Sequence, residues 1–285
     1  MGEATPSLAL LLDSWELFRD PILVGAVAGA VLGYLGVFIV LRRMVFVSAA
    51  LSQAAGLGVG LAFYAQTHWS LPPLAADPTA WAVALTLVTT WALAWNGRRL
   101  ITREGLLALF YLVGGSGALL VGTRISQEAH DIQAILFGTG VLVGPSDTAW
   151  VLGVGLVVLA LQLWWRRGLL FASLDPEGAR VRRLPTRLLD AVLLVSVAVL
   201  VSVSTRALGA LPVFAFSVLP ALAAVAVAPS PSVALALAAV VGLVAGVGGY
   251  LLAFFAEFPV GAAQTFVAAV AVALALGVGA IARRG

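Results

Sequence analysis

The chain has 285 residues, of which 62% are hydrophobic and only 10% are charged, and its mean hydropathy is +1.08. Soluble domains are about 45–50% apolar, so this composition excludes a soluble protein and indicates a single polytopic membrane domain over residues 1–285. The lack of cysteine excludes disulfides and thiolate metal sites. The net charge is +3, and all sixteen positively charged residues are arginines, a pattern more typical of membrane topology than of nucleic-acid binding.

The N-terminal segment, residues 1–20, is acidic and is expected to lie on the outer side of the membrane. Residues 7–19 are predicted to form a short helix in the membrane interface, with an apolar face made of Leu8, Leu11, Leu12 and Trp15. An acidic tail packed on the bundle is the alternative. The segment has no basic region before its apolar part, so we do not expect a cleaved signal peptide.

Nine apolar segments follow and predict an all-α protein with eight or nine transmembrane helices. They cover approximately residues 21–41, 44–64, 80–95, 105–123, 148–165, 188–203, 208–228, 232–254 and 260–281. In this topology thirteen of the sixteen arginines fall on the inner side, and Arg19, Arg124 and Arg206 fall on the outer side. Short cytoplasmic loops are enriched in basic residues, so the first helix ends in the cytoplasm.

Glycines at every fourth position indicate places where helices approach closely. Gly25, Gly29 and Gly33 form one such row, and Gly242 and Gly246 form a second. We expect both rows to serve packing rather than chemistry.

The stretch GVFIVLRRMVFVSAALSQAAGLGVG, residues 36–60, crosses from the first predicted helix into the second. It resembles the signature of the bacterial zinc/manganese ATP-binding-cassette (ABC) permeases, and residues 208–226 and 255–268 resemble later parts of the same family. The resemblance implies the permease subunit of a type II-like ABC importer in the bacterial cytoplasmic, or inner, membrane. Such a permease works with an ATP-binding subunit, an extracytoplasmic solute-binding protein and a second permease subunit, in contact with membrane lipid.

The second predicted helix carries the candidate substrate path, because it bears a polar stripe of Ser48, Ser52 and Gln53. The resembled family usually has an aspartate on this helix and a histidine four residues later, both implicated in handling the metal. Ala49 and Gln53 occupy those two positions. We therefore expect no metal site of charged ligands in the membrane, and no cofactor. An interhelical hydrogen bond is the alternative role for Gln53.

An outer segment contains three potential metal ligands, Glu128, His130 and Asp131. This outer rim is a candidate site for receiving a metal from a binding protein, since carboxylate and imidazole groups ligate zinc and manganese. A solvated loop without a binding role is the alternative.

The longest inner loop, residues 166–189, contains a predicted coupling helix. Asp175 is placed to cap a helix that has Pro176 at its first position, and Pro185 disfavours continuation beyond residue 184. In the resembled family this loop docks on the ATP-binding subunit, which assigns ATPase coupling to Asp175, Glu177, Gly178, Ala179 and Arg180. A solvated, positively charged connector is the alternative.

Together these features predict a permease for zinc, manganese or a metal complex. The sequence contains no P-loop, so ATP hydrolysis is expected in a separate subunit and the chain is not expected to be an enzyme. The missing aspartate and histidine leave four alternatives open: a degenerate partner in a heterodimer whose second permease supplies the ligands, a permease that passes the metal with only transient oxygen contacts, a permease for a non-metal substrate and a scaffold that transports nothing. A secondary carrier is a further alternative, but it usually needs an ionisable group inside the membrane, and none is evident.

Overall fold

The computed structural model describes residues 8–69, 72, 75, 77–95, 102–125 and 143–282. All regular structure in these ranges is helical. The helices are α1 (Leu8–Asp13), α2 (Trp15–Leu41), α3 (Val45–His68), α4 (Pro78–Trp95), α5 (Arg103–Ile125), α7 (Pro145–Leu174), α8 (Pro176–Val181), α9 (Thr186–Leu208), α10 (Ala210–Val227), α11 (Pro231–Ala256) and α12 (Val260–Ala282).

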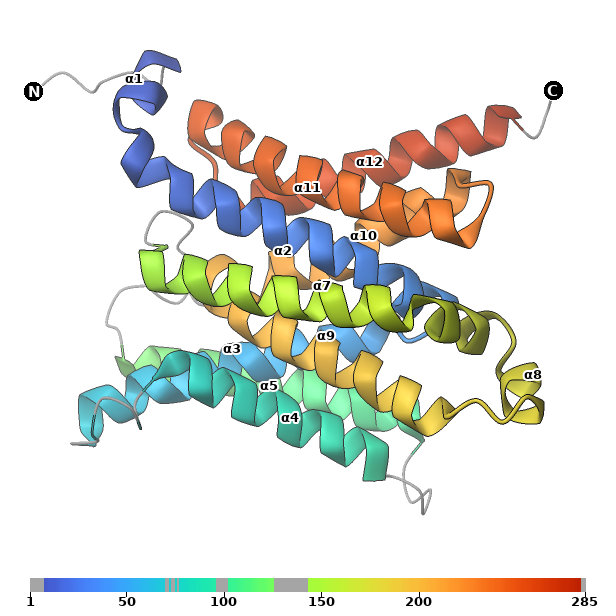
Figure 1. The fold of residues 1–285 in the computed structure, drawn as a ribbon. Coiled ribbons are helices and arrows are strands. Elements are labelled where there is room, and N and C mark those ends of the chain that lie inside the picture. The colour runs from blue at the N-terminus through green and yellow to red at the C-terminus, as the bar shows by residue number, and fades with distance from the viewer. Residues whose placement is uncertain are drawn as a thin grey trace, which may run out of the picture.

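Nine of the described helices, all except α1 and α8, are long and apolar enough to cross a membrane. Figure 1 shows these helices running roughly side by side, with the two chain termini at opposite ends of the bundle. An odd number of spans requires this arrangement. The prediction of an all-α protein with eight or nine transmembrane helices is therefore confirmed. By the positive-inside rule, the end of the bundle that carries Arg42, Arg43 and α8 is expected to face the cytoplasm.

Exposed tryptophans mark both ends of the bundle. Trp69 and Trp150 lie at outer helix ends, and Trp95 and Trp164 lie toward inner helix ends. Tryptophan is enriched at both membrane–water interfaces because its ring is apolar and its N–H is polar. The tryptophans thus agree with the positions of the two membrane surfaces, without distinguishing the inner surface from the outer one.

The N-terminal prediction was wrong in its boundaries. Only Leu8–Asp13 form a separate helix, and α2 already begins at Trp15. Pro21 therefore lies inside α2 and not at its start. On the predicted apolar face, Leu11 is buried, but Leu12 and Trp15 are exposed. A helix of 27 residues is about 40 Å long, so its first turns extend beyond a hydrocarbon core of about 30 Å.

The fifth span also differs from its prediction, because α7 continues to Leu174, well beyond residue 165. A helix of 30 residues is about 45 Å long, which exceeds the thickness of the hydrocarbon core. Arg166 and Arg167 therefore mark the membrane surface without ending the helix. Much of the predicted loop 166–189 is an extension of α7 into the cytoplasm.

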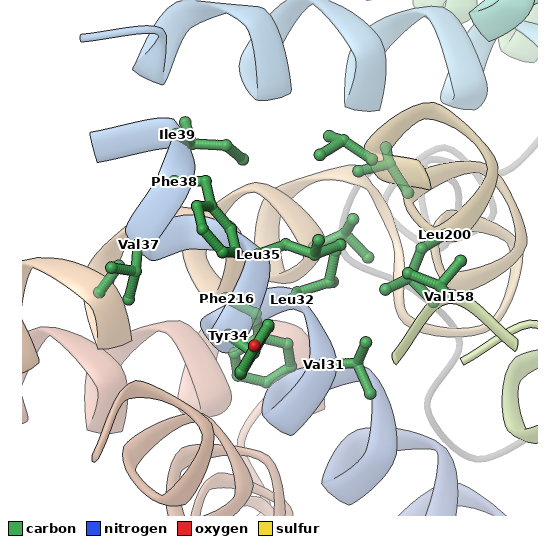
Figure 2. Close-up of a cluster of buried hydrophobic side chains, with 14 of the residues drawn as sticks. Val31, Leu32, Tyr34, Leu35, Val37, Phe38, Ile39, Val158, Leu200 and Phe216 are labelled. Atoms are coloured by element: carbon green, nitrogen blue, oxygen red, sulfur yellow. The ribbon is translucent and has the colours of Figure 1, made fainter. Parts of the chain in front are cut away.

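The core is built around α2. Figure 2 shows that Leu32, Leu35 and Phe38 of α2 belong to a buried hydrophobic cluster. The same cluster includes residues of most other helices, among them Val158 of α7, Leu200 of α9 and Phe216 of α10. The packing around α2 fixes the helices that carry the candidate site.

The two predicted glycine rows pack against each other, which confirms both as packing seams. A Cβ atom added to Gly29 would lie 2.8 Å from the carbonyl carbon of Gly242 and still closer to its oxygen. A Cβ atom on Gly25 would lie 3.2 Å from the carbonyl oxygen of Gly246. Only hydrogen atoms fit between α2 and α11 at these positions, so the two backbones are in direct contact.

Candidate functional site

The predicted substrate-path serines lie in the interior of the chain. Ser48 and Ser52 on α3 are fully buried. The Ser48 hydroxyl donates a hydrogen bond to the Val45 carbonyl at 2.9 Å, and the Ser52 hydroxyl donates one to the Ala49 carbonyl at 3.0 Å. Both hydroxyl protons are thus used within the same helix, a common way to satisfy serine in an apolar environment.

Gln53 differs from the two serines because its side chain is partly exposed. It lies against α5, where glycines leave room for it. A Cβ atom on Gly115 would lie 3.2 Å from the Gln53 Oε1 atom, and one on Gly114 would lie 2.8 Å from the Gln53 carbonyl carbon. Of the three predicted path residues, only Gln53 therefore offers accessible surface in this conformation.

The described residues contain no group of three or more histidine, aspartate and glutamate side chains that could hold a metal ion. His68 lies at the outer end of α3, where its ring stacks on Tyr64 with 4.1 Å between the ring centroids. The predicted outer rim, Glu128, His130 and Asp131, lies outside the described residues.

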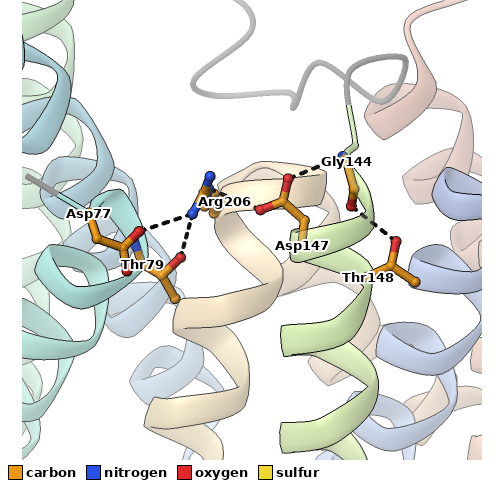
Figure 3. Close-up of polar contacts among 6 residues, drawn as sticks. All are labelled: Asp77, Thr79, Gly144, Asp147, Thr148 and Arg206. Atoms are coloured by element: carbon orange, nitrogen blue, oxygen red, sulfur yellow. Dashed lines mark hydrogen bonds and ion pairs between the residues drawn. The ribbon is translucent and has the colours of Figure 1, made fainter. Parts of the chain in front are cut away.

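An ionic cluster at the outer ends of three helices was missed by the sequence reasoning (Figure 3). Arg206 of α9 donates from Nη1 to Asp77 Oδ1 at 3.1 Å and to Thr79 Oγ1 at 2.7 Å, and its Nε lies 3.0 Å from Asp147 Oδ1. The arginine thus joins α9 to the starts of α4 and α7. We call Arg206, Asp77, Thr79 and Asp147 the outer clasp. One signal was available, since Arg206 is among the few arginines on the side where the positive-inside rule disfavours them.

A second ionic contact lies at the cytoplasmic ends of the helices. Arg42, directly after α2, donates from Nε to Ser173 Oγ at 2.8 Å and from Nη1 to the Asp190 carboxylate. Ser173 lies near the end of α7, and Asp190 lies in the first turns of α9. Arg42, Ser173 and Asp190, which we call the inner clasp, therefore hold both helices that flank α8.

The capped helix in the inner loop is confirmed. Asp175 accepts a hydrogen bond from the backbone N–H of Gly178 at 2.8 Å and so caps α8, with Pro176 at its first position. A Cβ atom on Gly178 would lie 2.7 Å from the Asp175 carboxyl carbon, so glycine leaves room for the cap. Ala179 is buried, whereas Glu177, Arg180 and Val181 are exposed. The buried side of α8 packs on the bundle, and the other side is exposed at the end of the bundle.

The sequence model of the ABC 3 transport family matches residues 14–279. The chain belongs to this family. The match covers eight of the nine spans completely, most of the ninth, and α8. The chain is therefore a multi-pass membrane permease, and the resemblance seen in residues 36–60 is confirmed.

Relatives within the family have names that refer to metals. The chain is 25% identical over 252 residues to the high-affinity zinc uptake system membrane protein ZnuB of Haemophilus influenzae, covering 87% of this chain and 92% of ZnuB. It is 25% identical over 267 residues to the manganese transport system membrane protein MntC of Halalkalibacterium halodurans, covering 93% of this chain and 88% of MntC.

The fold is also similar to a solved structure, PsaBC from Streptococcus pneumoniae in complex with an antibody Fab fragment. The TM-score is 0.80 at 24% sequence identity, and the match covers 94% of this chain and 95% of the compared chain. At this identity the likeness supports the shared fold.

Proposed function

We propose that this family member is the membrane-spanning subunit of a binding-protein-dependent ABC importer for a divalent metal, zinc or manganese, or a metal complex. The observation that carries the proposal is the family match over residues 14–279, together with relatives named for zinc and manganese transport. We infer three kinds of partner: an ATP-binding subunit, an extracytoplasmic binding protein and a second permease subunit, either a copy of this chain or a different one.

We propose that α8 is the helix that docks on the ATP-binding subunit, through Asp175, Glu177, Gly178, Ala179 and Arg180. Its location at one end of the bundle, the end that the positive-inside rule assigns to the cytoplasm, supports this role. Glu177 and Arg180 are exposed toward a partner, while the buried Ala179 anchors α8 on the bundle and Asp175 and Gly178 form the cap that keeps it helical.

The inner clasp is the proposed route by which movement of α8 reaches the spans. A displacement of α8 pulls on the end of α7 and the start of α9, and both are hydrogen-bonded to Arg42. Arg42 lies in the turn between α2 and α3, the helix with the proposed path residues.

We propose that the path runs along α3 and that Gln53 contacts the substrate first, because its side chain is partly exposed. Ser48 and Ser52 would join the path when α3 separates from its neighbours. Their hydroxyl oxygens and the Gln53 amide oxygen are hard ligands that suit manganese better than zinc. A path of neutral oxygens would hold the ion briefly and release it quickly. Transfer of the ion at Glu128, His130 and Asp131 stays a prediction.

The test is uptake of zinc and of manganese into proteoliposomes that contain this chain, its ATP-binding subunit and the binding protein, without another permease. We expect ATP-dependent uptake of at least one metal. Uptake that needs no ATP-binding subunit would instead identify a secondary carrier. Hydrolysis of ATP without metal uptake would require a second, different permease or another substrate.

A matched pair of variants tests the proposed role of α8. Glu177→Arg reverses a charge in the first turn of α8, and Glu104→Arg makes the same change in the first turn of α5. Both glutamates are exposed, both are on the cytoplasmic side, and both lose a similar interaction with the helix dipole. We expect only Glu177→Arg to lose uptake and co-purification of the ATP-binding subunit. Equal behaviour of the two variants would contradict docking on α8.

A further inference from the structure

A cavity of about 340 Å³ opens beside α8 at the cytoplasmic ends of the helices. Four arginines line it. Arg42 and Arg43 lie in the turn after α2, Arg103 is the first residue of α5, and Arg180 lies in α8. Asp190 is the one carboxylate among the lining residues.

The charges in the cavity are not balanced. Asp190 is engaged by Arg42 in the inner clasp. In the described ranges, no ion pair joins Arg43, Arg103 or Arg180 to a carboxylate. Arg103 donates only to the sulfur of Met44, at 3.2 Å, and a thioether is a weak acceptor. Three guanidinium groups are thus available to an anion.

An unsatisfied donor provides a second, independent observation. The Arg42 side chain is only 11% exposed. Its Nε and Nη1 atoms have partners, but its buried Nη2 has no hydrogen-bond partner. Buried donors in proteins nearly always have partners, so the Arg42 guanidinium, which belongs to a lining residue of the cavity, still has hydrogen-bonding capacity for an acceptor.

The cavity combines this charge with an apolar wall. Leu41, Ala172 and Leu194 line it together with the arginines. Guanidinium groups bind phosphate through paired hydrogen bonds, and basic pockets between transmembrane helices on the cytoplasmic side bind anionic lipid headgroups. A free phosphate ion would gain nothing from the leucine side chains, whereas the glycerol and the start of the acyl chains of a phospholipid would pack on them.

We propose that this cavity binds the headgroup phosphate of an anionic phospholipid of the cytoplasmic leaflet. The lipid would contact α8 through Arg180 and the inner clasp through Arg42. It would therefore lie between the helix proposed to meet the ATP-binding subunit and the spans that move. The binding step itself is independent of which substrate is transported.

Two double variants of the full chain test the proposal. Arg43→Asn with Arg180→Gln removes two charges from the cavity. Asparagine is chosen at position 43 because the backbone there has a φ of 55°, a conformation that asparagine adopts more readily than most residues. Arg166→Gln with Arg167→Gln removes two exposed charges at the inner end of α7 that do not line the cavity. None of the four side chains forms an ion pair in the described residues, so both variants are expected to fold.

The purified chain is incubated in neutral detergent with phosphatidylglycerol and phosphatidylcholine of matched acyl chains, and bound lipids are identified by native mass spectrometry. The unaltered chain and the Arg166/Arg167 variant are expected to retain one phosphatidylglycerol in preference to phosphatidylcholine. The Arg43/Arg180 variant is expected to bind it about 25-fold more weakly, because each basic residue at a membrane surface contributes roughly a factor of five.

Three results would overturn the proposal. Equal loss in both double variants would mean that general surface charge, not the cavity, attracts the lipid. Displacement of phosphatidylglycerol by millimolar inorganic phosphate would identify a site for free phosphate. Absence of any preference for phosphatidylglycerol over phosphatidylcholine in the unaltered chain would exclude a site for an anionic phospholipid.

Discussion

Replacing Gly29 by alanine is expected to push apart α2 and α11, the two helices whose backbones touch at the glycine seam. The added Cβ atom would lie 2.8 Å from the carbonyl carbon of Gly242 and closer to its oxygen. Observed Cβ contacts of this kind are longer than 3.0 Å. No flexible side chain can move aside here, because the obstacle is backbone. The helices themselves must separate.

The size of the effect follows from two opposing terms. Overpacking a tight interface costs about 1–3 kcal/mol. Alanine also has the higher helix propensity, which returns up to about 1 kcal/mol. The control is Gly153→Ala in the interior of α7, where a Cβ atom would meet nothing within 4 Å. This variant gains the same helix propensity without overpacking, so the difference between the two variants contains only the overpacking cost. We therefore expect Gly29→Ala to be less stable than Gly153→Ala by about 1–3 kcal/mol.

The assay is unfolding of the purified chain in detergent, followed by tryptophan fluorescence and by the fraction that stays monodisperse after heating. Gly242→Ala should behave like Gly29→Ala, since its Cβ atom would lie 2.6 Å from the Gly29 carbonyl carbon. The double variant should cost less than the sum of the two, because one separation of the helices accommodates both methyl groups. Equal stability of Gly29→Ala and Gly153→Ala would refute direct backbone contact between α2 and α11.

Two further predictions concern the outer clasp and the path. Arg206→Met should destabilise the chain by about 1–3 kcal/mol, because Asp147 is only 13% exposed and would lose its counter-charge. The control in the same unfolding assay is Arg124→Met, since Arg124 is exposed and has no ion pair in the described residues. Ala49→Asp with Gln53→His places two metal ligands one turn apart on α3 and should increase the zinc retained after gel filtration, measured by elemental analysis. Retention unchanged from the parent chain would contradict placement of the path along this face of α3.

Much of the fold could be predicted because membrane insertion makes strong demands on the sequence. Each span must be continuously apolar and each cytoplasmic loop basic, so hydropathy and arginines define the nine helices. Local signals also located the cap at Asp175 and the glycine rows, since both act between residues a fixed number of positions apart. The end of α7 could not be found in this way. Leu169 is fully buried beyond Arg166 and Arg167, and tertiary packing continues the helix where the bilayer no longer requires it.

The candidate site was harder to predict, because polarity alone does not show where a side chain points. Ser48 and Ser52 form a polar stripe in the sequence, yet both hydroxyls bond to the backbone of their own helix. The outer location of Arg206 is unusual under the positive-inside rule and could be seen in the sequence. Its partners Asp77 and Asp147, however, are far away in the sequence. Ion pairs of this kind depend on which helix ends meet, and no local pattern specifies that.

The two clasps together constrain how a push on α8 can spread. At the cytoplasmic side Arg42 bonds to the end of α7 and the start of α9, and at the outer side Arg206 of α9 bonds to the start of α7. The two helices are thus tied at both ends, with α8 as their connection. Sliding one past the other would break charged contacts at both membrane surfaces, whereas moving them as a pair, together with the Arg42 turn, breaks neither link between them. We therefore expect α7, α8 and α9 to respond to the ATP-binding subunit as one rigid body.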